Sequence, residues 1–576
     1  MRLASLTIGS DKPGDKQRFK NLKNVTIDFD EGEWITVVIG WNGTGKSNVL
    51  EALATIFRDL IGKPKNRPTI VGEHSEPEKP EFSYRLRYFC HNKEIVVDAD
   101  PDRSTKLSEQ YEISYKALSN KQEDSALQTS LFSEIDSDEF QLVKFSRFIQ
   151  DRDSFLPAYI FGYYSGHSQR MHDVFYPYLE RYDDNLRNGI DPGLRKMFYA
   201  KPVHSQFTLL AFMLNQESFV QEFLEEHFGI DTEVGIDSVL FVLNQPPWKS
   251  NAEDGDPRFW NSRGVVREFL SRLYDVALAP IRIRRRTQTS LWNKTTLEYL
   301  YLYVKDRDAL RELVGNMAPR EFFRDLESTY VSELIEEVRI RVKLKNNDGT
   351  VIFRELSEGE QQLLTVLGLL RFTAEEEGLF LLDEPDTHLN PQWSVDYFKY
   401  LKMFVASGKG GSSSHIVLNT HNPLAVAELA REQVQILYRD PEYLSITSHL
   451  PEFDPRGMGY TGIVTSDMFG LPSSVDSRTQ RRLEIYRVLA SIKIRTKFQE
   501  LRFKVIQDWL DKDRFKLNQR DDDYQRYLEI RTELLSSKFD DDEYQTLIRH
   551  ALSLSSDERE RIAREAVAAV LSERDS

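Results

Sequence analysis

A ten-residue stretch near the amino terminus constrains this chain more than any other part of it. Residues 39–48 read IGWNGTGKSN. The residues that fit the spacing G-x-x-x-x-G-K-[ST] are Gly40, Gly43, Gly45, Lys46 and Ser47. In loops of this spacing the backbone N–H groups surround a nucleotide phosphate, the lysine reaches the β- and γ-phosphates, and the hydroxyl binds Mg²⁺. Asn42 and Asn48 lie in the same stretch and are expected beside the nucleotide.

The residues on both sides of this loop have the pattern that it requires. WITVVIG, before it, is typical of a buried strand. KSNVLEALATIFRDLIG, after it, carries apolar residues at helical spacing. The sequence therefore predicts a strand, a phosphate-binding loop and a helix, with ATP and Mg²⁺ as cofactors.

Two acidic residues far downstream predict the second part of a nucleotide site. In GLFLLDEPDTHLNP an apolar run ends in Asp383 and Glu384. A buried parallel strand delivers carboxylates at its carboxyl end in this way. We expect Asp383 to hold the Mg²⁺ shell and Glu384 to polarise the water that attacks the γ-phosphate. Taken alone, the same residues also fit a strand followed by a capped acidic turn.

Two further motifs flank these acids in the sequence. In ELSEGEQQLLTVLGLLRF, the Ser357 hydroxyl and the Gly359 backbone at a helix amino terminus suit an anion such as a γ-phosphate. The alternative is a capping box, in which Ser357 caps the helix and Glu360 reaches back. HIVLNTHNPL is another apolar strand that ends near His421, although a lone histidine there is more often a surface residue.

In this chain order, the four motifs resemble those of the ABC-type ATPases. The matching residues are 40–47 as Walker A, 356–360 as signature, Asp383 and Glu384 as Walker B, and His421 as the switch histidine. The resemblance implies that two heads sandwich ATP, so that Ser357 and Gly359 of one subunit complete the phosphate site of the other. It also implies that ATP closes a dimer.

The same resemblance suggests roles for two further residues. Asp386, two residues after Glu384, is expected at the D-loop on the dimer seam. The strand AYIFGYYSG precedes the place where the family has its Q-loop, and Gln169 is the nearest glutamine, which implies a contact to Mg²⁺. Ser165 or His167 could equally face the site.

The expected fold class is α/β, an ABC-type P-loop ATPase head with an antiparallel β layer over residues 68–118. The head is interrupted by a large, compact helical insertion and followed by a helical C-terminal tail. The predicted parts are the N-terminal half of the head, the insertion or lid, the C-terminal half of the head and the tail, at residues 1–164, 165–335, 336–450 and 451–576. We expect the tail to serve either as a partner surface or as a plain structural element.

A basic cluster in the insertion is the candidate for nucleic-acid contact. IRIRRRTQTSLWNK contains Arg282, Arg284, Arg285 and Arg286, with Trp292 and Lys294 after them. Such a cluster could neutralise backbone phosphates while the tryptophan stacks on a base. A basic strand edge paired with acidic residues is at least as good an interpretation, because the chain has 76 Lys and Arg against 92 Asp and Glu, a net charge of −16.

Composition and missing motifs narrow the class further. No run of apolar residues is long enough to cross a membrane, which argues against a transporter, and a single cysteine fits a reducing, cytoplasmic setting. No paired-histidine nuclease motif, Toprim acid pattern or serine elbow is found, so we expect ATP hydrolysis but no nuclease activity in this chain.

These features resemble the PtuA ATPases of Septu-type and retron-associated anti-phage systems. That resemblance implies a homodimer or higher oligomer that controls a separate HNH nuclease, and it suggests a reverse transcriptase with its RNA–DNA product as a further partner. The alternatives are a DNA-repair ATPase of the RecF or SMC type and an OLD-like nuclease with an unrecognised active site.

Overall fold

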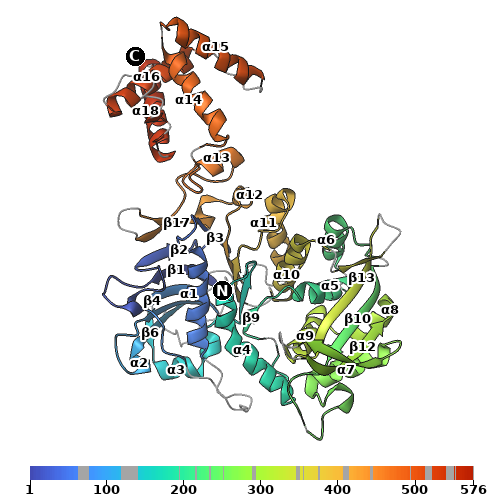
Figure 1. Ribbon diagram of the computed structural model, residues 1–576. Coiled ribbons are helices and arrows are strands. Elements are labelled where there is room, and N and C mark those ends of the chain that lie inside the picture. The colour runs from blue at the N-terminus through green and yellow to red at the C-terminus, as the bar shows by residue number, and fades with distance from the viewer. Residues whose placement is uncertain are drawn as a thin grey trace, which may run out of the picture. The chain divides into compact units, whose positions relative to one another are not determined.

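The computed structural model describes most of the chain, in two compact units, Met1–Leu450 and Pro451–Ser576 (Figure 1). The described residues are 1–62, 77–118, 140–193, 195–214, 217–232, 235–250, 252–288, 294–345, 350–353, 356–373, 377–406, 414–440, 445–471, 473–492, 494–512, 522–539, 550–551, 553–554 and 556–574. Trp292 of the basic cluster lies outside them, and the side chain of Lys294 is likewise not described.

A seven-stranded sheet forms the centre of the first unit, in the order β18-β17-β3-β16-β15-β8-β9. Its strands are β3 (Ile35–Gly40), β8 (Tyr159–Tyr164), β9 (Met197–Tyr199), β15 (Gly378–Asp383), β16 (His415–Asn419), β17 (Val434–Arg439) and β18 (Ile446–His449). All neighbouring pairs are parallel except β17 with β18. Every residue of β15 and β16 is buried, because both faces of a parallel sheet are covered.

A six-stranded antiparallel sheet, in the order β2-β1-β4-β5-β6-β7, forms a second layer. Its strands are β1 (Arg2–Ile8), β2 (Val25–Asp28), β4 (Tyr84–Cys90), β5 (Lys93–Ala99), β6 (Tyr111–Ala117) and β7 (Gln141–Val143). Helix α1 (Lys46–Ile61) shares one hydrophobic core with both sheets. The antiparallel layer predicted for residues 68–118 is thus confirmed for the described strands β4 to β6, with α2 (Leu107–Gln110) and α3 (Phe145–Gln150) beside it.

The insertion differs from the prediction of a compact helical lid. It contains the helices α4 (Arg170–Arg187), α5 (His204–Leu214), α6 (Ser218–Phe228), α7 (Gly264–Val276), α8 (Arg307–Val314) and α9 (Pro319–Val331). It also contains most of an antiparallel sheet in the order β11-β12-β10-β13-β14, formed by β10 (Ile236–Asn244), β11 (Ile281–Gln288), β12 (Lys294–Val304), β13 (Ile335–Lys343) and β14 (Thr350–Ile352). The insertion is thus helical only in part, and the prediction missed its sheet, although the β-branched and aromatic residues of IDSVLFVLN and KTTLEYLYLYV favour strands.

The last helices of the first unit are α10 (Glu358–Thr373), α11 (Pro391–Ala406) and α12 (Pro423–Val426), and α10 packs on both α5 and α11. Short 3₁₀ helices occur at Asp15–Gln17, Arg152–Ser154, Pro257–Phe259 and Arg431–Gln433.

The second unit contains α13 (Gly459–Thr465), α14 (Ser477–Ser491), α15 (Lys497–Lys512), α16 (Asp522–Phe539) and α18 (Ser556–Arg574). Helix α14 packs on α15 and on α16, and α16 packs on α18. None of the helices in the described ranges is both long and apolar enough to cross a bilayer.

Candidate functional site

Four segments far apart in the sequence meet at one edge of the parallel sheet. Asp383, at the end of β15, pairs in register with Asn419 of β16 on one side and with Tyr164 of β8 on the other. β3 pairs with β16 and leads into the glycine-rich loop. Because the carboxyl ends of parallel strands lie at the same edge, the loop, the two acids and the segment after β16 form one site.

The loop after β3 has the backbone that its glycines allow. Gly40, Gly43 and Gly45 have φ values of 147°, 87° and 96°. A Cβ atom at Gly40 would lie 2.4 Å from the carbonyl oxygen of Leu437. Around Gly43, by contrast, there is open space. The loop is therefore packed against the protein at its start and open at its tip, where a phosphate would approach the backbone N–H groups.

Lys46 folds back over this loop. Its Nζ donates to the carbonyl oxygens of Gly40, at 2.8 Å, and Trp41, at 3.2 Å. Burial lowers the pKa of Lys46 to about 8, and the nearby carboxylates of Glu384 and Asp383 oppose this shift. The ammonium group is thus held in a desolvated position, no carboxylate of the described residues bonds to it directly, and a phosphate oxygen would supply an anion.

Asp383 and Ser47 form a pair of oxygen ligands. The buried Asp383 carboxylate accepts hydrogen bonds from the Ser47 hydroxyl and from Asn419 Nδ2, the latter at 3.1 Å. Burial raises the pKa of Asp383, although both hydrogen bonds act to lower it. Hydroxyl and carboxylate oxygens are the ligands that Mg²⁺ prefers, so these two residues fit the ion predicted for them.

Glu384 lies in a strained backbone conformation, with a φ of 53°. Such a conformation in a residue other than glycine is typical of functional sites. His421 Nε2 lies 3.2 Å from Glu384 Oε1, and this hydrogen bond lowers the pKa of Glu384 against the opposing effect of burial. The main-chain oxygen of Glu384 accepts a hydrogen bond of 3.2 Å from Gln362 on α10. Glu384 is therefore an ionised, oriented carboxylate at the open edge of the sheet.

Asp386, expected at the D-loop, is buried beside the end of β16. Only 3% of the residue is exposed. Both carboxylate oxygens accept from the Thr420 hydroxyl, at 2.9 and 2.7 Å. Burial raises its pKa to about 6. The side chain thus fixes the end of β16 from within its own subunit, and the place of Asp386 on a dimer seam stays a prediction.

The signature segment forms the capping box that was the alternative interpretation. Ser357 Oγ accepts from the backbone N–H of Glu360 at 3.3 Å, and the Glu360 carboxylate accepts from the Ser357 backbone N–H at 2.6 Å. At Gly359 a Cβ atom would lie 2.4 Å from the carbonyl oxygen of His388, so only glycine lets α10 approach the loop after β15 this closely. Ser357 remains exposed, and its role toward a second subunit stays a prediction.

Gln169 precedes α4 and lines a cavity of about 740 Å³ together with Gln362 and His388. A smaller recess directly beside Ser47 and Asp383 is lined by Ser168 and Arg170 instead. Ser165 and His167, the other two candidates, line the same larger cavity as Gln169. The contact of Gln169 with Mg²⁺ stays a prediction.

Sequence reasoning missed Asn21 and Arg170, which both contact the phosphate-loop region. Asn21 Nδ2 donates to the carbonyl oxygen of Gly43 at 3.0 Å, and its Oδ1 accepts from Asn48 Nδ2 at 2.6 Å. Arg170 Nη1 donates to Asn48 Oδ1 at 3.2 Å. Asn42, by contrast, is simply exposed in the loop. No motif marks Asn21, which lies in the polar connection between β1 and β2.

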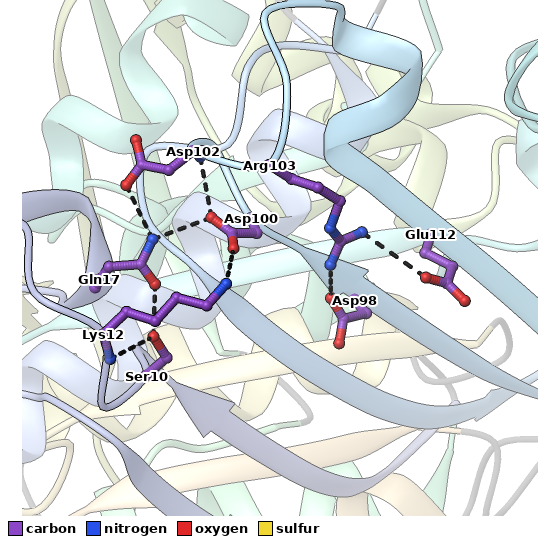
Figure 2. Close-up of polar contacts among 8 residues, drawn as sticks. All are labelled: Ser10, Lys12, Gln17, Asp98, Asp100, Asp102, Arg103 and Glu112. Carbon is purple, nitrogen blue, oxygen red and sulfur yellow. Dashed lines mark hydrogen bonds and ion pairs between the residues drawn. The ribbon is translucent and has the colours of Figure 1, made fainter.

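A hydrogen-bonded network anchors the connection that carries Asn21 (Figure 2). Lys12 Nζ donates to Asp100 at 2.8 Å, and Gln17 Nε2 donates to Asp100 at 3.0 Å and to Asp102 at 2.9 Å. Burial acts to raise the pKa of Asp100, but these hydrogen bonds outweigh it and lower the pKa. The loop between β5 and α2 thus holds the connection that places Asn21 against the phosphate loop.

The predicted basic cluster lies on the edge strand β11 and divides into two parts. Arg282 and Arg284 both pair with Glu298 of β12, at 2.6 and 3.5 Å. Arg285 and Arg286 are exposed and form no ion pair within the described part of the chain. The two interpretations of the cluster therefore apply to different residues, and contact with nucleic acid stays a prediction for Arg285 and Arg286.

Comparisons with known proteins agree with this geometry. The family described as "AAA ATPase domain" matches residues 17–158, and the family described as "AAA domain, putative AbiEii toxin, Type IV TA system" matches residues 216–427. The two matched regions contain the phosphate-binding loop and the two acids, so the chain is similar to AAA-type ATPase domains on both sides of its site.

A curated relative narrows this class. The chain is 25% identical over 198 residues to the Septu protein PtuA of Bacillus mycoides (strain KBAB4), a match that covers 32% of this chain and 27% of that protein. The chain thus spans about a quarter of the length of the curated relative that it matches. These findings support an ATPase of the PtuA type.

Proposed function

We propose that this chain is the ATP-binding and ATP-hydrolysing regulatory subunit of an anti-phage defence complex in the cytoplasm. One observation supports the proposal that the chain binds and hydrolyses ATP. The loop around Lys46, the carboxylates of Asp383 and Glu384, and His421 converge at one edge of the parallel sheet. The similarity to the Septu protein PtuA supports the setting in defence.

Each residue of the site has one task in ATP hydrolysis. Lys46 neutralises charge on the phosphates, and Ser47 and Asp383 would hold Mg²⁺, which would offset the negative charge of the phosphate oxygens when bound. Glu384 orients the attacking water and receives its proton. His421 fixes the carboxylate of Glu384 through their 3.2 Å contact.

In this proposal two chains clamp ATP between them, as a dimer or within a higher oligomer. Ser357 and Gly359 of one chain complete the phosphate site of the other. The exposure of Ser357 at the amino end of α10 supports this arrangement, because a helix amino terminus attracts anions.

The complex includes a separate HNH nuclease subunit, and in a retron-associated form also a reverse transcriptase with its RNA–DNA product. The ATP clamp controls the nuclease, so that this chain itself cuts no nucleic acid. Arg285 and Arg286 are its candidate contacts to the nucleic acid, because they are exposed and form no ion pair within the described residues.

A mixing experiment tests the composite site. Lys46→Ala removes the phosphate ligand of a chain's own loop, and Ser357→Arg blocks the contribution of that chain to its partner. Each variant alone should lose ATP hydrolysis, whereas a mixed dimer retains one intact site, formed by the loop of one variant and the signature of the other. Mixing should therefore restore part of the activity. If the mixture stays as inactive as its components, ATP is not shared between two chains.

The defence setting has its own test. The chain is co-expressed with its neighbouring genes, purified, and weighed by native mass spectrometry with and without ATP. A nuclease subunit that co-purifies and cuts DNA only in a nucleotide-dependent way supports the proposal. Nuclease activity of the purified chain alone, in Mg²⁺ or Mn²⁺, would contradict it.

A further inference from the structure

One side of α15 exposes a row of large apolar side chains. Ile494, just before the helix, and Phe498, Leu501 and Val505 within it are 90%, 68%, 64% and 61% exposed. The spacing of three and four residues places Phe498, Leu501 and Val505 along one side of α15, and Ile494 lies in the segment before it. Single exposed apolar residues are ordinary on protein surfaces, but a contiguous row marks an interaction site. These four residues are called the α15 stripe.

The opposite side of α15 already provides the packing that this helix needs. Phe503, Ile506 and Leu510 are buried in a core shared with α14. The rings of Phe503 and Tyr486 stack with their centroids 5.0 Å apart, and the Arg495 guanidinium lies 4.0 Å from the centre of the Phe503 ring. The orientation of α15 within its unit is therefore fixed by its buried side, and the stripe is not required to hold the helix in place.

Basic residues border the stripe on both sides. In a heptad with Phe498 and Leu501 at the a and d positions, the flanking positions hold Lys497, Arg502 and Lys504. Two carboxylates lie near these basic residues: Glu500, 3.4 Å from Arg495 and 3.8 Å from Lys504, and the exposed Asp508, three residues after Val505. In a chain with a net charge of −16, a surface with this local excess of positive charge selects for a partner of opposite charge.

We propose that the α15 stripe binds an amphipathic helix of a partner protein that carries acidic residues on both sides of its apolar seam. The apolar side chains supply the buried contact, and glutamates or aspartates at the flanking positions pair with the basic border.

A second copy of α15 does not meet these requirements. A parallel pairing of two stripes sets Lys497 of one chain against Arg502 of the other, and an antiparallel pairing sets each flanking position against its like. Both arrangements place like charges together, which destabilises the pairing. The partner is therefore a different, acidic helix.

This inference goes beyond the proposed function and does not depend on it. The stripe belongs to the second unit and the ATP site to the first. Variants of the stripe should leave ATP hydrolysis unchanged, so the failure of one proposal is distinguishable from the failure of the other.

The test uses the full chain and three fluorescent peptides of equal length. All three carry leucine at the a and d positions of the same heptad helix, and their flanking positions hold glutamate, glutamine or lysine. Fluorescence anisotropy should show the glutamate peptide binding at least about tenfold more tightly than the glutamine peptide, and the lysine peptide most weakly. Salt should weaken the binding of the glutamate peptide, because the flanking charges are exposed.

Substitutions assign this binding to the stripe. Phe498→Ser with Leu501→Ser should abolish it, whereas Leu571→Ser on α18 is a matched control, since Leu571 is an apolar helix residue that is 53% exposed. Lys497→Glu with Lys504→Glu should reverse the preference in favour of the lysine peptide. Circular dichroism of each variant checks that its helices are intact.

Three results would overturn the proposal. The peptides bind with equal affinity, or Leu571→Ser weakens binding as much as the stripe variant does. The third result is a smaller mass for the stripe variant than for the unchanged chain in light scattering without peptide, because that would show that a second copy covers the stripe.

Discussion

The buried ion pair between Arg195 and Glu327 in the insertion allows a quantitative prediction. Glu327 of α9 is 3% exposed and forms an ion pair with Arg195. It also accepts a 2.7 Å hydrogen bond from His204 Nε2, whose proton lies on that nitrogen because Nδ1 accepts the backbone N–H of Lys201. Burial acts to raise the pKa of Glu327, but His204 and Arg195 outweigh it and lower the pKa to about 2.

The pKa shift of Glu327 gives the size of the contribution that these contacts make to the free energy of unfolding. A fall in pKa from 4.5 to about 2 corresponds to about 3 kcal/mol of the free energy of unfolding. Since the pKa is lower in the folded state, this contribution is complete above pH 4.5 and is lost as the pH falls toward 2. Glu327→Gln leaves the buried Arg195 without its counter-ion, which costs about 3–5 kcal/mol. We therefore expect Glu327→Gln to lower the free energy of unfolding at pH 7 by at least about 3 kcal/mol.

Urea unfolding at pH 7, followed by circular dichroism, measures this change. The control is Glu225→Gln, which breaks an exposed ion pair with Lys345 and should cost no more than about 1 kcal/mol. The double variant with methionine at both Arg195 and Glu327 should recover much of the loss, because it removes both buried charges together. If Glu327→Gln lowers the free energy of unfolding by no more than Glu225→Gln does, Arg195 and Glu327 do not stabilise one another as described.

Further outcomes are expected at the ATP site and on β11. Asn21→Ala removes the hydrogen bond to the carbonyl oxygen of Gly43, which contributes about 1 kcal/mol, so ATP affinity measured by calorimetry should fall about fivefold. An unchanged Kd would exclude a role for Asn21 in shaping the loop. Glu384→Gln should retain ATP and accumulate as a dimer in light scattering, and rapid hydrolysis by this variant would refute its role. Arg285→Ser with Arg286→Ser should weaken binding to a labelled oligonucleotide and flatten its salt dependence, and an equal salt dependence in both proteins would refute contact at β11.

The elements of the ATP site could be predicted because each has a strong local pattern. β15 and β16 are short apolar runs that end in polar residues, and the lysine of the loop follows two glycines at fixed spacing. Such patterns reveal strands and their carboxyl ends without any knowledge of the rest of the fold. Their meeting at one edge then follows from parallel pairing.

Other features depend on contacts between distant residues and had no local pattern. Asn21 reaches the phosphate loop because its connection is held by Asp100 and Asp102 on another loop. Asp386 turns inward because the Thr420 hydroxyl, in the segment after a different strand, donates to its carboxylate. The insertion sheet was missed for a different reason: β10 and β12 do carry strand-forming residues, but they lie far apart within a region rich in helical residues.

The hydrogen bonds of Gln362 have a consequence for how two ATP sites communicate. This residue lies one turn into α10, donates to the main-chain oxygen of Glu384 and accepts from the backbone N–H of His388, at 3.2 and 3.4 Å. In the proposed clamp, the start of α10 serves the partner's nucleotide, whereas Glu384 serves the chain's own. In that arrangement a movement of α10 that follows ATP binding at one site would reach Glu384 of the other, and we expect the two sites to hydrolyse ATP cooperatively, with a sigmoidal dependence on its concentration.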